Sequence, residues 1–117
     1  MPFVETYYDP KWISEKPMRV LIDDISKSIA WRLLKKRDYK TIRRVKIIWK
    51  PNPEKSINMP KIFIKISSGH FNKDANCPSK VLELIKFDLR KNPAIKSLPE
   101  DSVILKAVWE DSHVLKY

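Results

Sequence analysis

Few residues of this sequence have the types and spacing that catalysis or metal binding requires. His70 and His113 are 43 residues apart and have no acidic or cysteine partner at the spacing of metal ligands, so we expect no metal site. Gly69 is the only glycine, which excludes a glycine-rich phosphate loop. Cys77 precedes Pro78 at a predicted helix start, where a thiolate is stabilised, but a structural role is the favoured interpretation.

The charge of the chain points to anionic partners. It carries 24 Lys and Arg against 14 Asp and Glu, a formal net charge of +10. Nucleic acid, an acidic membrane surface or small carboxylates would all suit that charge. Nucleic acid is the less favoured partner, because Lys and Arg occur in both halves and no nucleic-acid-binding motif is present. The residues available to stack on bases are Tyr7, Tyr8, Trp12 and Phe71.

The chain length and the cysteine count predict a single cytoplasmic domain. A chain of 117 residues is typical of one domain with one core. Cys77 is the only cysteine, so no intramolecular disulfide can form. Residues 1–10 lack the basic start and apolar stretch of a signal peptide. No apolar run approaches the roughly 20 residues of a membrane span, so no membrane partner is expected.

Hydrophobic periodicity predicts the elements that must position any site. In the first half a strand is expected at residues 3–8, a helix from Pro17 with Lys35, Lys36 and Arg37 in its last turn, and a strand at 42–49. In the second half a strand is expected at 61–67, a helix from Pro78 that ends at Asn92-Pro93, and a strand at 103–109. Each half is therefore predicted to be β-loop-α-β.

The two halves also contain similar short sequence segments. VKIIW ends at Trp49 and LKAVW ends at Trp109, and each follows a Met-Pro pair, Met1-Pro2 or Met59-Pro60. We interpret this as an internal duplication within the single domain 1–117, with repeats at 1–50 and 59–110. The alternative is two unrelated βαβ units that share a tryptophan by coincidence.

These units predict an α/β fold of two layers. A helix between two strands crosses over the sheet and implies parallel pairing with a right-handed connection. Two units side by side give a four-stranded sheet with two helices on one face. The second face would then expose Ile, Val, Phe and Trp in a monomer, so we expect an oligomer that covers it. Trp49 and Trp109 are expected to be core or subunit-interface anchors.

With a proline after the initiator Met and a duplicated β-α-β unit, the sequence resembles the tautomerase superfamily. That superfamily includes 4-oxalocrotonate tautomerase, 5-carboxymethyl-2-hydroxymuconate isomerase and macrophage migration inhibitory factor. The stretch VLIDDISKSIAWRL…TIRRVKII resembles the helix-to-strand passage of the oxalocrotonate enzymes. IRRVKIIW and KIFIKISSG resemble strands of the carboxymethyl-hydroxymuconate isomerases. The resemblance covers nearly the whole chain and implies a homotrimer.

The resemblance implies a cofactor-independent isomerase that moves a proton between the enol and keto forms of a small anionic keto or dienol carboxylate. Removal of Met1 would leave Pro2 as a secondary amine. An α-amino group titrates near about 7.7–8.0, and burial with neighbouring cations would lower that pKa and make it a base. Arg43 is the favoured catalytic arginine, with Arg44 binding substrate. Lys11 lies where the oxalocrotonate enzymes have another substrate-binding arginine, and a lysine lacks the forked guanidinium that can donate two parallel hydrogen bonds.

Two other functions stay open. If Met1 is retained, Pro2 carries an amide nitrogen with no basic lone pair, and the chain would be a non-catalytic protein of the same fold. The other alternative is a basic nucleic-acid-binding module, whose affinity would fall steeply with salt. Each candidate residue also has a purely structural interpretation. Pro2 could simply begin a strand, and Arg43 and Arg44 could be solvated strand positions.

Overall fold

The computed structural model describes residues 2–52 and 60–109. The elements, in chain order, are β1 (Phe3–Tyr8), α1 (Glu15–Arg32), α2 (Tyr39–Ile42), β2 (Lys46–Pro51), β3 (Ile62–Ser68), α3 (Pro78–Leu89), α4 (Pro93–Lys96) and β4 (Val103–Trp109). The strands predicted at 3–8 and 103–109 are confirmed with the same bounds. Met1, Met59 and His113, whose places in the sequence were considered above, lie outside the described residues.

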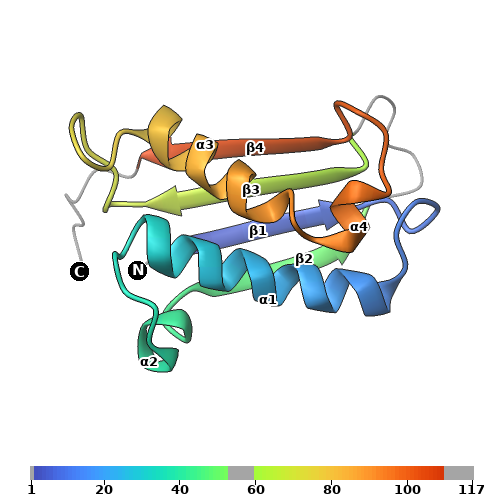
Figure 1. The fold of residues 1–117 in the computed structure, drawn as a ribbon, viewed down its shortest axis with the longest axis horizontal. Helices are drawn as coiled ribbons and strands as arrows, with labels where there is room; N and C mark the ends of the chain where they lie inside the picture. Colours follow the sequence, from blue (N-terminus) through green and yellow to red (C-terminus); the bar gives the residue numbers. More distant parts are fainter. Residues whose placement is uncertain (1, 53–59, 110–117) are drawn as a thin grey trace, which may run out of the picture.

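The four strands form one mixed sheet in the order β2-β1-β3-β4. β1 pairs with β2 and β3 pairs with β4 in parallel, while the central pair β1 and β3 is antiparallel. The two long helices α1 and α3 lie side by side on one face of this sheet (Figure 1). The predicted two-layer architecture is therefore confirmed, with each half a β-α-β unit.

The core lies between the sheet and the two helices. Alternate strand residues face the helices, as the two-residue period of a strand requires. The fully buried residues at this interface include Val4, Ile62, Ile64 and Ile66 from the sheet and Leu21, Ile25, Ile29, Val81 and Ile85 from the helices. Burial of each such side chain contributes about 1.5–3 kcal/mol. No helix among residues 2–52 and 60–109 is long and apolar enough to cross a membrane.

A partly buried ion pair joins the two long helices. Asp88 of α3 accepts hydrogen bonds from Arg32 of α1, at 2.9 Å from Nε to Oδ2 and 2.7 Å from Nη2 to Oδ1. Ser28 of α1 donates a third hydrogen bond to Oδ2 at 2.8 Å. The side chains of Arg32 and Asp88 are only 21% and 23% exposed, so solvent screens this pair weakly. The Arg32 hydrogen bond holds the pKa of Asp88 below its usual range.

The first long helix ends earlier than expected. Pro17 lies in its first turn as predicted, but α1 stops at Arg32, and Lys35 follows with φ of 62°. A residue in the left-handed region cannot continue a right-handed helix, and here the Lys36 amide reaches back to the Ala30 carbonyl at 3.2 Å. The prediction that Lys35, Lys36 and Arg37 form the last helical turn was wrong; they follow the helix and are exposed.

The second strand also begins later than expected. Asp38 caps a short helix, α2, by accepting a hydrogen bond from the Thr41 amide at 3.0 Å, and β2 starts only at Lys46. Arg43 is the C-cap of α2, and Arg44 lies in the following turn. The placement of both arginines on a strand was therefore wrong.

The pairing register limits the proposed duplication. Phe3 of β1 pairs with Lys46 of β2, an offset of 43 residues, whereas Ile62 of β3 pairs with Val103 of β4, an offset of 41. The two Met-Pro pairs are 58 residues apart in the sequence, and Trp49 and Trp109 are 60 apart. With these register offsets, the Met-Pro pairs and the tryptophans cannot both occupy equivalent positions in the sheet. The duplication stays a hypothesis that rests on the shared β-α-β order.

The two tryptophans differ in their surroundings. The ring of Trp49 lies on the helix-facing side of β2, with its centroid 5.8 Å from that of Tyr8 and the Arg19 guanidinium 5.9 Å above it. Trp109, at the end of β4, is 49% exposed. Trp49 is therefore part of the packing within one chain, as expected, while the surface of Trp109 is free to contact another molecule.

Within residues 2–52 and 60–109, no helix covers the second face of the sheet. Its residues mix apolar side chains (Phe3, Tyr7, Ile48, Phe63, Ile104 and Val108) with Lys46, Lys50, Lys65, Lys106 and Glu5. Phe3 and Ile48 are each 39% exposed and Ile104 is 46% exposed. Glu5 and Lys65 approach to 3.9 Å across the central strand pair. This face, hereafter the open face, is the bare surface that the sequence predicted.

Candidate functional site

Pro2 lies at the start of the first strand, in the middle of the sheet. It is buried, and its carbonyl accepts a hydrogen bond from the Lys46 amide at 3.1 Å. The antiparallel register pairs Phe3 with Ser67, and continuing it by one residue puts Pro2 opposite Ser68 on the helix-facing side. Directly opposed residues of such a pair have Cβ atoms about 4.5–5.5 Å apart. Pro2 therefore has β2 on one side and Ser68 on the other.

Ser68 and His70 form a hydrogen-bonded pair beside Pro2. The His70 amide donates to the Ser68 hydroxyl oxygen at 3.0 Å, and the same oxygen is 3.1 Å from Nδ1 of the His70 ring. That oxygen can donate its own hydrogen to Nδ1 or accept one from it, according to the tautomer of the ring. When the hydroxyl donates, the neutral imidazole carries its proton on Nε2. Burial lowers the pKa of His70, which favours this neutral form.

This pair was not predicted from the sequence. His70 was interpreted only with respect to metal binding, and Ser68, which is fully buried at the end of β3, was not identified as a candidate. A serine two residues before a histidine, at the end of a predicted strand, is a local signal for a side-chain-to-backbone turn. The neighbourhood of Pro2 comes instead from pairing between strands about 60 residues apart, which no local pattern encodes.

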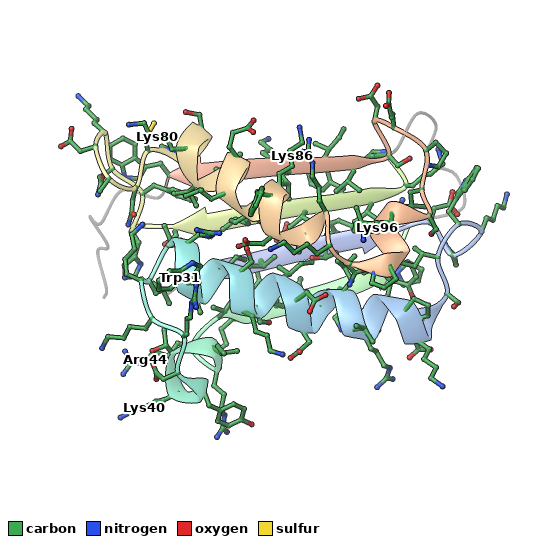
Figure 2. The ribbon with its side chains drawn as sticks, in the orientation of Figure 1. Trp31, Lys40, Arg44, Lys80, Lys86 and Lys96 are labelled. Atoms are coloured by element: carbon green, nitrogen blue, oxygen red, sulfur yellow. The ribbon has the colours of Figure 1, made fainter. Side chains whose placement is uncertain are left out.

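The two arginines lie at the same end of the sheet as Pro2. The Arg44 amide donates to the Thr41 carbonyl at 3.0 Å in the turn that leads into Lys46, the residue bonded to Pro2. Both side chains are exposed, and the guanidinium of Arg43 lies 5.5 Å from the ring centroid of Tyr39. Figure 2 shows Arg44 with Lys40 on the α2 projection, beyond the end of α1. The fold therefore brings two free cations to the margin of the Pro2 region.

Lys11 lies at the opposite end of the first strand. It follows Tyr8 in the loop after β1, where its amide donates to Asp9 at 2.9 Å. A strand of six residues is about 20 Å long at 3.3 Å per residue. Within one chain, Lys11 and Pro2 do not share a site.

Two surface grooves lie away from Pro2. The larger, about 850 Å³, runs between α3, α4 and β4 and has Leu82, Leu98 and Leu105 in its lining. The smaller, about 570 Å³, lies between α1 and α3 over the Arg32–Asp88 pair. Neither is lined by Pro2, Ser68 or His70. Size alone would favour the larger groove, but Pro2, Ser68, His70, Arg43 and Arg44 all lie outside both linings.

We expect His70 to make the stability of the protein depend on pH. Its folded-state pKa lies below the ordinary value of 6.5, so the unfolded chain binds a proton at a pH where the folded chain does not. The free energy of unfolding should therefore fall as the pH decreases from about 6.5 through the folded-state pKa. Urea unfolding at a series of pH values measures this.

His70→Asn is the matched variant for this measurement, because its amide oxygen can replace Nδ1 as acceptor for Ser68 but does not titrate. The pH dependence between neutral and mildly acid conditions should be shallower in the variant. An identical slope in both proteins would show that His70 titrates normally.

Comparison with solved structures finds similar folds at low identity. 5-Carboxymethyl-2-hydroxymuconate delta-isomerase matches with a TM-score of 0.62 at 13% identity, over 100% of this chain and 88% of that one. N1, a member of the cis-3-chloroacrylic acid dehalogenase family, matches with a TM-score of 0.60 at 14% identity, over 91% of this chain and 74% of the other. MIF2 of Leishmania major gives 0.55 at 16%, over 92% and 87%.

These structures belong to the tautomerase superfamily, so the resemblance seen in the sequence is confirmed for the fold. Identities of 13–16% establish the architecture and leave the chemistry to the residues of this chain. No protein-family model and no curated protein matches the sequence.

Proposed function

We propose that this chain is a tautomerase that moves a proton between the enol and keto forms of a small anionic keto or dienol carboxylate. One observation carries the proposal: Pro2 begins the central strand, buried, at the end of the sheet where the Ser68–His70 pair and the turn carrying Arg43 and Arg44 also lie. Solved structures with this fold include an isomerase of a carboxymethyl-hydroxymuconate, which supports the same kind of substrate.

Removal of Met1 would make Pro2 a secondary amine. Burial and neighbouring cations both favour the neutral form of an amine, which is the form that accepts a proton. The amine takes the proton α to the carbonyl, an enolate forms, and the ammonium returns the proton at the other carbon or at oxygen. No cofactor is needed, because the carbonyl itself delocalises the negative charge of the enolate.

The arginines would bind and polarise the substrate. A guanidinium donates two parallel hydrogen bonds to a carboxylate and can stabilise the enolate oxygen. We propose Arg43 for the catalytic role and Arg44 for carboxylate binding, since both lie on the turn that leads into β2. Lys11 can bind substrate at this site only from a second copy of the chain, because about 20 Å of strand separates it from its own Pro2.

The open face supports a homo-oligomer, which we propose to be a trimer on the basis of the family resemblance. Several apolar side chains remain exposed there in the single chain, Ile104 among them at 46%. Mixed apolar and charged residues of this kind suit an interface better than solvent. A cytoplasmic location is proposed from the single free cysteine.

We expect Ile104→Glu to weaken subunit association. The position is exposed in one chain, so the monomer should fold, but an oligomer covering the open face would bury an unpaired carboxylate. The dissociation constant between subunits should rise at least about tenfold, since 1.4 kcal/mol corresponds to that factor. Sedimentation velocity over a range of concentrations measures it.

Val20→Glu is the control for Ile104→Glu. Val20 is 56% exposed on α1, in the helix layer, and is not on the open face. It should leave association unchanged. A wild-type protein that sediments as a monomer at all concentrations would contradict the oligomer.

The function is tested first by the intact mass of the protein from its native host, then by an enol–keto assay. A mass lacking one methionine, with conversion of a phenylpyruvate-like or hydroxymuconate-like acid, supports the proposal. A mass that retains Met1 would contradict the proline mechanism, because the Pro2 nitrogen would be an amide, and would favour a non-catalytic protein of this fold.

A further inference from the structure

The chain segment between α1 and β2 concentrates positive charge. Residues 35–44 carry six cations and one acid, a charge of +5 out of +10 for the whole chain. All six cationic side chains are exposed: Lys35, Lys36, Arg37, Lys40, Arg43 and Arg44. We call residues 31–44, with Trp31 and Tyr39, the basic projection. Lys and Arg occur in both halves of the sequence, but half of the net charge lies in less than a tenth of it.

These cations have no acidic partner within the described residues. None of the four ion pairs found there includes a residue of the segment 35–44. Its single acid, Asp38, is occupied by α2: it accepts from the Thr41 amide at 3.0 Å and from the Thr41 hydroxyl at 2.7 Å. The charge of residues 35–44 is therefore available to an external anion.

The corresponding segment of the second half lacks most of this charge. Residues 90–102, the whole connection from α3 to β4, carry Arg90, Lys91 and Lys96 against Glu100 and Asp101, a charge of +1, whereas the whole connection from α1 to β2, residues 33–45, carries +5. A β-α-β unit of this protein therefore does not require a strongly basic connection. The +5 of the first half calls for an explanation other than the fold.

Planar groups are interleaved with the cations. The Arg37 guanidinium lies 3.8 Å from the ring centroid of Trp31, and Tyr39 is 73% exposed beside Arg43. Holding Arg37 on Trp31 fixes a flat, charged surface whose outer side faces solvent. An exposed tyrosine and a stacked guanidinium offer faces on which unpaired bases can stack, while the neighbouring cations contact phosphates.

We infer that the basic projection binds the backbone and bases of a single-stranded nucleic acid. Single strands are favoured over duplex because only unpaired bases reach an aromatic face. An anionic membrane is disfavoured because Tyr39 is the one largely exposed aromatic side chain in residues 31–44, which lack the continuous apolar helix face that inserts between lipids. This inference does not depend on the proposed enzymatic function.

The test uses fluorescence polarisation of the full chain with a labelled oligothymidine of about 10 nucleotides. The projection variant is Lys36→Gln with Arg37→Gln and Lys40→Gln. The control is Lys80→Gln with Lys86→Gln and Lys96→Gln, which removes the same charge from α3 and α4 (Figure 2). Arg43 and Arg44 are left intact because they belong to the proposed active site.

The projection variant should lower the slope of log affinity against log salt by about 2, as expected for three lost phosphate contacts on a single strand. Tyr39→Ala should weaken binding roughly tenfold at every salt concentration, because stacking is not an ionic contact. The control variant should stay within about twofold of wild type. Circular dichroism of each variant checks that it is folded.

Four results would overturn the inference. The first is no binding by the wild-type protein; the second is an equal loss in projection and control variants, which would indicate net charge alone. The third is binding of a duplex as tightly as of the single strand. The fourth is binding to phosphatidylserine vesicles or polyglutamate that depends on the projection while the oligothymidine does not bind.

Discussion

Replacement of Pro2 by Ala should lower kcat/KM for enol–keto conversion about a hundredfold or more. A positioned base contributes typically about 10²–10⁴ to the rate, and alanine leaves a primary amine of different basicity and direction. The fold should tolerate the change, because Pro2 uses only its carbonyl in the sheet, accepting from the Lys46 amide. The measurement is the rate of ketonisation of a phenylpyruvate-like acid, with Tm recorded alongside.

A glycine inserted ahead of Pro2 is the matched control. The trimmed protein then begins with that glycine, Pro2 is retained as a residue, and its nitrogen becomes an amide without a basic lone pair. Activity should fall at least as far as in Pro2→Ala. Full activity in the insertion variant would show that the nitrogen of Pro2 is not the base, whatever the result with alanine.

Asp88→Ala should destabilise the protein by about 2–3 kcal/mol. The change removes three hydrogen bonds between α1 and α3 and leaves the Arg32 guanidinium mostly buried without its carboxylate. A domain of this size is stable by about 5–15 kcal/mol, so the loss is a large fraction. Urea denaturation at fixed protein concentration measures it.

Asp23→Ala is the control for this variant. Asp23 pairs with Lys27 on the same helix layer, but both side chains are about 60% exposed, so the change should cost less than about 0.5 kcal/mol. The contribution of Asp88 should also disappear in acid. Its folded-state pKa is lowered, so its stabilisation is present above the unfolded-state pKa and is lost as pH falls through the folded-state value. Equal losses in the two variants would contradict the special role of Asp88.

The regular elements were predictable because their patterns are long. The strands at 3–8 and 103–109 and the helix from Pro78 follow from alternation and from the three- and four-residue period. The short helix α2 was not predictable in this way, because four residues carry no period. Because α2 was not predicted, Arg43 and Arg44 were placed on a strand. The left-handed conformation of Lys35, which ends the preceding helix, was not predictable either, because such a position is usually occupied by glycine.

The candidate site was predictable only in part. Pro2 and the arginines came from the resemblance, whereas Ser68 and His70 are beside Pro2 because β1 pairs antiparallel with β3. That pairing joins segments about 60 residues apart and is decided by the packing of the whole sheet. Periodicity identifies which residues form strands, but it does not identify which strands are neighbours.

The place of β1 in the sheet has a consequence for the order of synthesis. β1 precedes both of its partners in the sequence, yet it is an inner strand that needs β2 on one side and β3 on the other. The partner on the β3 side ends only at Ser68, so the sheet cannot close around β1 until that residue has been made. Until then Pro2 is not held in its buried position, which leaves an interval in which a processing enzyme can reach it.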